Sequence, residues 1–168
     1  RLEWKNQLIE DFESRANAAP IDLPVGTIDR EMEFRRLALT GRFDHLKEVF
    51  MTGRTYEGNA GFHIVTPFTL DDGRMILVNR GWVSESYRDP AKRDFTLVEG
   101  ETQLEAIIRF PNKKGYFVPE NDPENGFWFT LVPAQIVSHL QLDGQAETAI
   151  YAAALRTSDE IRLPIGAR

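Results

Sequence analysis

Four consecutive residues, Asn79-Arg80-Gly81-Trp82, combine side chains that could do chemistry at the end of an apolar run. A guanidinium binds carboxylates and other oxyanions, and an indole offers a large apolar surface with one hydrogen-bond donor. Two interpretations are open. Either the four residues form an exposed surface that contacts a partner, or Arg80 pairs with a neighbouring carboxylate and Trp82 caps the core.

A second group of residues with recognisable chemistry lies in a loop. Residues 119 to 126 read Pro-Glu-Asn-Asp-Pro-Glu-Asn-Gly, which is dense in turn formers, and three aromatic rings follow directly. Asn121 and Trp128 complete the candidate surface with the four residues above. The carboxylates of this loop are typical of a solvated face, so they are assigned to no site.

Signals for catalysis and for metal binding are few. The three histidines are His45, His63 and His139, and they lie on different predicted elements without a ligand spacing such as His-x-x-x-His. We interpret them as neutral core or surface residues. There is no cysteine, no glycine-rich phosphate loop and no Gly-x-Ser-x-Gly motif. We therefore nominate no catalytic residue and no metal ligand, and we expect a protein that is not an enzyme.

Size and charge restrict the class of protein. The 168 residues fit one domain, and 42% hydrophobic with 27% charged residues is typical of a globular chain. Acidic residues outnumber basic ones by 26 to 20, which argues against nucleic-acid binding. The longest apolar run, residues 149 to 155, is far shorter than the roughly 20 residues of a membrane span. The start at Arg1 without a methionine suggests a soluble segment of a longer protein.

The elements that position the candidate residues are mainly strands. Residues 73 to 83 follow a turn signal and predict a central strand buried on both faces. Side chains alternate along a strand, so Arg80 and Trp82 should share the face of Ile76 and Val78. Further strands are predicted at about residues 33 to 43, 47 to 56, 62 to 68, 100 to 110 and 148 to 156. Most connections are too short for parallel crossovers, which favours antiparallel pairing.

Two helices complete the predicted fold. A stripe of apolar residues predicts an amphipathic helix over residues 1 to 17, and Pro133 opens a short helix that should end near Gly144. The predicted fold class is α+β. We expect a mainly antiparallel curled sheet or partly open barrel, with an N-terminal helix and a short helix after Trp128.

A series of sequence blocks occurs in a fixed order: Trp4-Lys5, Gly41-Arg42-Phe43-Asp44-His45, Gly61-Phe62-His63-Ile64-Val65-Thr66-Pro67-Phe68, Leu77-Val78-Asn79-Arg80-Gly81-Trp82-Val83, and Phe117-Val118-Pro119-Glu120-Asn121-Asp122-Pro123. The last two blocks are specific when they occur together at this separation. Nearly end to end, the chain resembles the surfeit-locus-one family of cytochrome c oxidase assembly factors. In that family a soluble domain lies between two transmembrane helices, and the resemblance implies that this chain is that domain.

The resemblance implies an assembly factor for cytochrome c oxidase that aids haem a insertion or stabilises the core subunit. The implied partners are that core subunit, haem a, and the membrane through flanking helices. The implied location is the periplasmic side of a bacterial inner membrane or, alternatively, the intermembrane-space side of the mitochondrial inner membrane. The candidate surface of Asn79, Arg80, Gly81, Trp82, Asn121 and Trp128 then becomes a candidate partner or haem-edge surface.

The same resemblance limits what this segment should bind. The candidate haem ligand of the family lies near the second membrane helix, so none of the three histidines is carried over as a ligand. We expect no cofactor in this segment, no tight haem a binding by the segment alone, and haem a binding only in the full-length parent. If both ends continue into one membrane, Trp4 and Ile165 should lie near the same sheet edge.

A second class of function fits the same predicted fold. A small-ligand-binding antiparallel barrel, lipocalin-like or oligosaccharide-binding, would hold its ligand inside. Its interior should contain a cavity lined by Phe62, Phe68, Phe110 and Tyr151. In an assembly factor, those rings should instead fill the interior.

Overall fold

The computed structural model describes residues 17 to 87, 100 to 112, 116 to 142 and 145 to 155, together with residues 10 and 14. The strands are β1 (Arg36–Phe43), β2 (Val49–Tyr56), β3 (Asn59–Leu70), β4 (Met75–Ser84), β5 (Thr102–Arg109) and β6 (Tyr151–Ala154), and the helix is α2 (Pro133–Leu140). Short 3-10 turns are η1 (Arg30–Met32), η2 (His45–Lys47), η3 (Glu85–Tyr87) and η6 (Pro123–Asn125). The predicted helix over residues 1 to 17 and the predicted approach of the two ends fall almost entirely outside the described residues.

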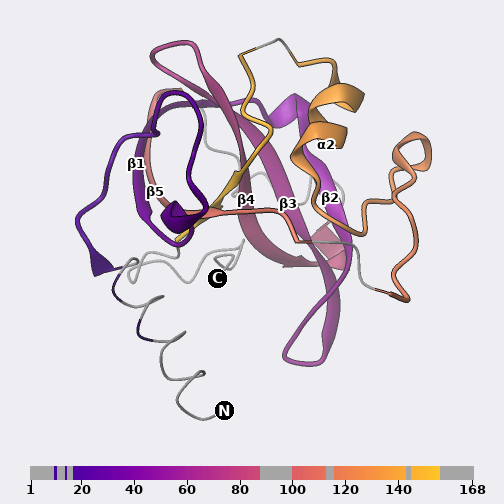
Figure 1. Cartoon of the computed structure of the whole chain (residues 1–168). Coiled ribbons are helices and arrows are strands. Elements are labelled where there is room, and N and C mark those ends of the chain that lie inside the picture. The colour runs from indigo at the N-terminus through magenta and orange to yellow at the C-terminus, as the bar shows by residue number, and fades with distance from the viewer. Residues whose placement is uncertain are drawn as a thin grey trace.

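Five strands close into a barrel in the order β1, β5, β6, β4 and β3 (Figure 1). Closure occurs because β1 pairs with β5 along most of its length and with β3 through residues 41 to 43. Strand β2 extends the sheet beyond β3. The predicted mainly antiparallel sheet is confirmed, but the barrel is closed and not partly open.

One strand pair departs from the predicted antiparallel pattern. β4 and β6 run parallel, with Val78 opposite Ala152 and Asn79 opposite Ala153. The chain between these strands includes β5 and α2, so it is long enough for the crossover that a parallel pair requires. β6 is also shorter than the strand predicted over residues 148 to 156.

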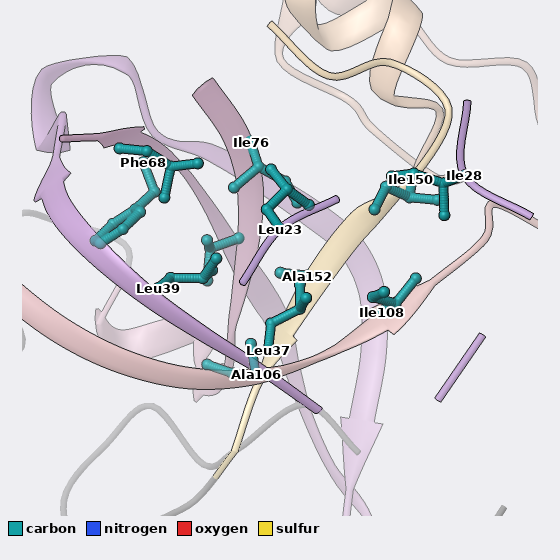
Figure 2. Packing of buried hydrophobic residues seen from close by; sticks show 13 residues of the cluster. Leu23, Ile28, Leu37, Leu39, Phe68, Ile76, Ala106, Ile108, Ile150 and Ala152 are labelled. Atoms are coloured by element: carbon teal, nitrogen blue, oxygen red, sulfur yellow. The ribbon is translucent and has the colours of Figure 1, made fainter. Parts of the chain in front are cut away.

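The barrel interior is filled by apolar side chains. Figure 2 shows them meeting from all sides of the barrel, and the cluster includes Leu37, Leu39, Phe68, Ile76, Ala106, Ile108, Ile150 and Ala152. Their exposed fractions are 0 to 2%, so these side chains are withdrawn from solvent and pack against one another. Phe62 belongs to a separate cluster with Phe50, and Tyr151 packs against the cluster beneath α2. The four rings of the ligand-barrel hypothesis therefore do not line one cavity.

The predicted short helix after Trp128 is α2, which covers the outer face of the sheet near β2 (Figure 1). Pro133 occupies its first turn, where a missing N–H is tolerated, and Pro133 and Ile136 are buried. Ile136 packs with Leu77 of β4 and with Trp128. The helix ends at Leu140, before the predicted end near Gly144, and its C-cap residue Gln141 adopts a left-handed conformation with φ of 55°.

Candidate functional site

A β-bulge at the end of β4 decides where the candidate side chains point. The neighbours Ile64 and Val65 of β3 pair with Gly81 and Asn79, so Arg80 is an extra residue on β4. Gly81 has φ of 118°, a conformation that other residues rarely adopt. The bulge therefore interrupts the alternation of side chains along the strand.

Arg80 lies in a buried polar cluster beside η2. Its Nη1 is 2.9 Å from Oε2 of Glu48, and the two side chains are 6% and 5% exposed. The same carboxylate oxygen accepts hydrogen bonds from Thr66 Oγ1 and His45 Nδ1, each at 2.8 Å. The Arg80 guanidinium also lies 5.2 Å from the centre of the Phe43 ring. Arg80 thus meets a carboxylate, as the structural interpretation of the sequence predicted.

Asn79 and His63 form a second polar pair, on the outer face of the sheet. The backbone N–H of Gly81 donates to Asn79 Oδ1 at 3.0 Å, which identifies the amide nitrogen as the atom 3.1 Å from His63 Nδ1. Nδ1 must accept this bond, so the ring proton is on Nε2. Burial, together with the charge of Arg54, lowers the pKa of His63 to about 4. This histidine is neutral, and Asn79 favours the tautomer that offers no Nε2 lone pair to a metal.

Trp82 packs on the same outer face as His63, its partner across the strand pair. Its Nε1 donates to the backbone oxygen of Arg54 at 3.3 Å, and the side chain is 7% exposed. Glycine at position 61 makes room for the ring, because a Cβ there would lie 2.5 Å from Trp82 Cε2. The prediction that Arg80 and Trp82 share one face is therefore wrong, and the extra residue in the bulge is the reason.

Asn121 organises the loop between η6 and α2. Its Nδ2 donates to the Thr130 oxygen at 2.8 Å and to Gln135 Oε1 at 2.7 Å. Its Oδ1 accepts from the backbone N–H groups of Phe129 and Thr130, at 2.7 and 2.9 Å. Both ends of the amide are used within the fold, which gives this residue a structural role.

Trp128 attaches the same loop to the sheet. Its ring is 2% exposed and packs in the cluster beneath α2, with the His139 ring 5.5 Å away. Its backbone oxygen accepts a hydrogen bond of 2.6 Å from Thr52 N, so the loop continues the sheet beyond β2. His139 lies on the exposed side of α2.

Sequence reasoning missed Arg54, which connects the two halves of the candidate surface. Its guanidinium donates to the backbone oxygens of Thr52 and Phe129 at 2.9 and 3.0 Å, and its own backbone oxygen accepts from Trp82. Burial lowers the pKa of Arg54. No local signal distinguishes Arg54 from the arginines of the other strands, because Phe129 and Trp82, to which it is bonded, lie on distant segments.

The expected exposure of the candidate surface is wrong for four of its side chains. Asn79, Arg80, Trp82 and Trp128 are 2 to 7% exposed, since each is held by the contacts above. The structure brings Asn79, Arg80, Gly81 and Trp82 together at the bulge of β4. Asn121 and Trp128 lie in the loop before α2, and Arg54 connects this loop to the bulge through its bonds to Phe129 and Trp82. Their role toward a partner or a haem edge stays a prediction.

Comparison with known proteins places the chain in a family. The model of the SURF1 family matches residues 1–165. The chain belongs to the SURF1 family. Surfeit locus protein 1 of Mus musculus is 37% identical over 145 residues, which cover 77% of this chain and 47% of the mouse protein. The SURF1-like protein of Monosiga brevicollis is 36% identical over 164 residues, which cover 88% of this chain and 63% of that protein.

The human relative gives the same result. Surfeit locus protein 1 of Homo sapiens is 37% identical over 145 residues, covering 76% of this chain and 48% of the human protein. This SURF1 family chain thus spans about half the length of its mouse and human relatives. Within the ranges that the structure describes, no helix has both the length and the hydropathy of a membrane span.

Proposed function

We propose that this chain is a domain of a cytochrome c oxidase assembly factor, which acts without catalysis to aid haem a insertion or to stabilise the core subunit. The observation that carries the proposal is the match to the SURF1 family over residues 1–165. The packed barrel supports it further. Phe68 and Ile108 occupy the interior, where a small-ligand-binding barrel would hold its ligand, and this packing argues against that alternative.

The partner of the domain, in this proposal, is the core subunit of cytochrome c oxidase. Flanking membrane helices of the full-length parent would hold the domain on the periplasmic side of a bacterial inner membrane or, alternatively, on the intermembrane-space side of the mitochondrial inner membrane. The parent, and not this segment, would bind haem a. The tautomer of His63 is consistent with this division, because its Nδ1 accepts from Asn79 and its Nε2 therefore carries the proton.

Within that role, the bulge and the loop act as a rigid support. Glu48 joins β3 to β4 through its bonds to Thr66 and Arg80, and Arg54 joins β2 to the loop at Phe129. A partner would therefore meet a preformed surface over these elements, which reduces the entropy lost on association.

The proposal is tested by deleting the gene for the parent protein in its own organism and restoring it on a plasmid. We expect the deletion to lower the haem a signal in reduced-minus-oxidised spectra of membranes and to lower oxidase activity. The b-type cytochrome signal should be unchanged, and the restored gene should recover both losses. A deletion strain with normal haem a content and normal oxidase activity would rule out the proposed role.

The haem part of the proposal has a separate test. The purified parent with its membrane helices and this segment alone are each titrated with haem a while the Soret band is recorded. We expect saturable binding only for the parent. A saturable low-spin spectrum from the segment alone, lost in a His45→Gln or His139→Gln variant, would move the haem site into this domain.

A further inference from the structure

An open groove lies between α2 and the loop that carries η6 (Figure 1). Its volume is about 650 Å³, which is within the range of ligand sites in proteins. Residues 121 to 124 form the loop wall, and Ala134, Gln135 and Ser138 belong to the helix wall. Because the groove is open to solvent, it suits a segment of another chain better than a small molecule, which needs enclosure.

Short side chains on α2 leave the space for this groove. Ala134 and Ser138 are one helical turn apart, so they lie on the same side of α2, and both are exposed. The buried side of the helix carries Ile136, which packs with Trp128 and Leu77. The groove therefore uses the side of α2 that packing against the sheet leaves open, and a long side chain at position 134 would fill it.

Hydrogen bonds hold both walls of the groove in place. Asn121 Nδ2 donates to Gln135 Oε1 at 2.7 Å, which joins the loop wall to the helix wall. Within the loop, Asp122 and Phe127 exchange two backbone hydrogen bonds, at 2.7 and 3.0 Å. The groove is thus preformed, which lowers the entropy cost of binding.

The charge of the groove is negative. Asp122 and Glu124 line it, and no lysine or arginine lines it within the ranges that the structure describes. Asn125 Nδ2 donates to Asp122 Oδ2 at 2.7 Å, which orients this carboxylate and leaves it capacity for a further donor. The sequence pattern assigned these carboxylates to a solvated face, whereas the structure places a groove beside them. The net charge of −6 adds to the attraction of a cation.

We propose that this groove binds a segment of a partner protein that carries lysine or arginine. A cationic side chain of the segment would meet the carboxylates of Asp122 and Glu124. The Gln135 amide and the Ser138 hydroxyl can bond to the backbone of the segment. A second copy of this chain is a poorer occupant, because two chains of net charge −6 repel each other. The proposal does not depend on the role in oxidase assembly.

Selection from a library of random peptides tests the proposal without knowledge of the partner. Phage-displayed peptides are selected on the whole chain, and the most enriched peptide is synthesised and titrated while 1H–15N spectra are recorded. We expect enrichment of lysine and arginine, and saturable shifts at the amides of residues 121 to 124 and 134 to 139. Enrichment of acidic or uncharged peptides, no enrichment, or shifts only outside the groove would overturn the proposal.

Variants show whether the selected peptide uses the groove and its charge. Glu124→Lys reverses one charge and should weaken binding about three- to tenfold, with a smaller effect at high salt. Ala134→Met fills the groove without a change of charge and should weaken binding too. Glu101→Lys and Ala38→Met make the same changes at exposed positions elsewhere and should leave the affinity unchanged. The amide spectrum of each variant checks that it folds. Full affinity in folded Glu124→Lys and Ala134→Met would contradict the proposal.

The oligomeric state separates a partner segment from a second copy of the chain. Sedimentation of the wild-type chain and of Ala134→Met is compared at the concentration used for the titration. We expect the same sedimentation for both, because the wild-type groove is not filled by another copy. A wild-type dimer that dissociates in Ala134→Met would show that a second copy occupies the groove and would overturn the proposal.

Discussion

Glu48 is the single acceptor on which donors from three separate elements converge. The Glu48→Gln variant keeps the shape of the side chain but leaves the buried charge of Arg80 without its counterion. Loss of one partner from a buried ion pair costs about 3 to 5 kcal/mol, and we expect a loss of unfolding free energy of that order. Urea denaturation at neutral pH measures it. Glu57→Gln, in the exposed turn after β2, is the control and should change little.

His63 should make stability depend on pH in a defined window. Its pKa is about 4 in the folded chain against an ordinary value of 6.5, so between these values the unfolded chain binds more protons. Acidification through this window therefore destabilises the fold, by about 2 to 3 kcal/mol once pH 4 is reached, while the contribution is constant above pH 6.5.

The His63→Gln variant isolates this effect, because glutamine does not titrate and its Oε1 can still accept from Asn79. Urea unfolding of both chains at several pH values should give a shallower acid loss for the variant. Equal slopes for the wild type and His63→Gln would show that His63 is not the titrating group.

At the scale of elements, Asn121 decides whether the loop before α2 is ordered. Asn121→Ala removes the acceptor of two backbone N–H groups, at Phe129 and Thr130, and the donor to the Thr130 oxygen. We expect a loss of about 2 to 3 kcal/mol and faster amide exchange at those two residues. Hydrogen exchange measured by NMR reports both. Asn125→Ala, which removes only a bond to Asp122 Oδ2, should leave that exchange unchanged.

The elements that sequence patterns predicted are those specified by local signals. β5 follows from alternating apolar residues, and α2 follows from Pro133 and the apolar positions after it. The bulge in β4 depends on register against β3, and Gly81 inside a strand was its one local sign. Glu48 lies 32 residues from Arg80 in sequence, so no local pattern could identify this ion pair.

At the scale of the whole molecule, the strand pairing that closes the barrel also brings together the side chains that fill its interior. β1 completes the barrel by pairing with both β5 and β3, and β6 enters between β5 and β4. Small residues on the adjacent strands β5 and β6, Ala106 and Ala152, pack in the same interior cluster as the larger Leu37 and Phe68. Alternation along β4 correctly placed Ile76 and Val78 in the interior. The diameter of the barrel instead follows from which strands pair, and no single segment of the sequence reveals that pairing.

The filled interior leads to a prediction that separates it from a ligand-binding barrel. Ala106 is fully buried on β5, so Ala106→Leu adds three carbons to a space that has no room for them. Overpacking of this kind costs about 1 to 3 kcal/mol or more, whereas an open cavity would accept the larger side chain at little cost. Ala38→Leu makes the same change at an exposed position of the neighbouring strand β1 and is the matched control. Urea unfolding should show a large loss for Ala106→Leu and almost none for Ala38→Leu. Equal stability of the two variants would mean that the barrel holds unfilled space and would reopen the case for a ligand inside it.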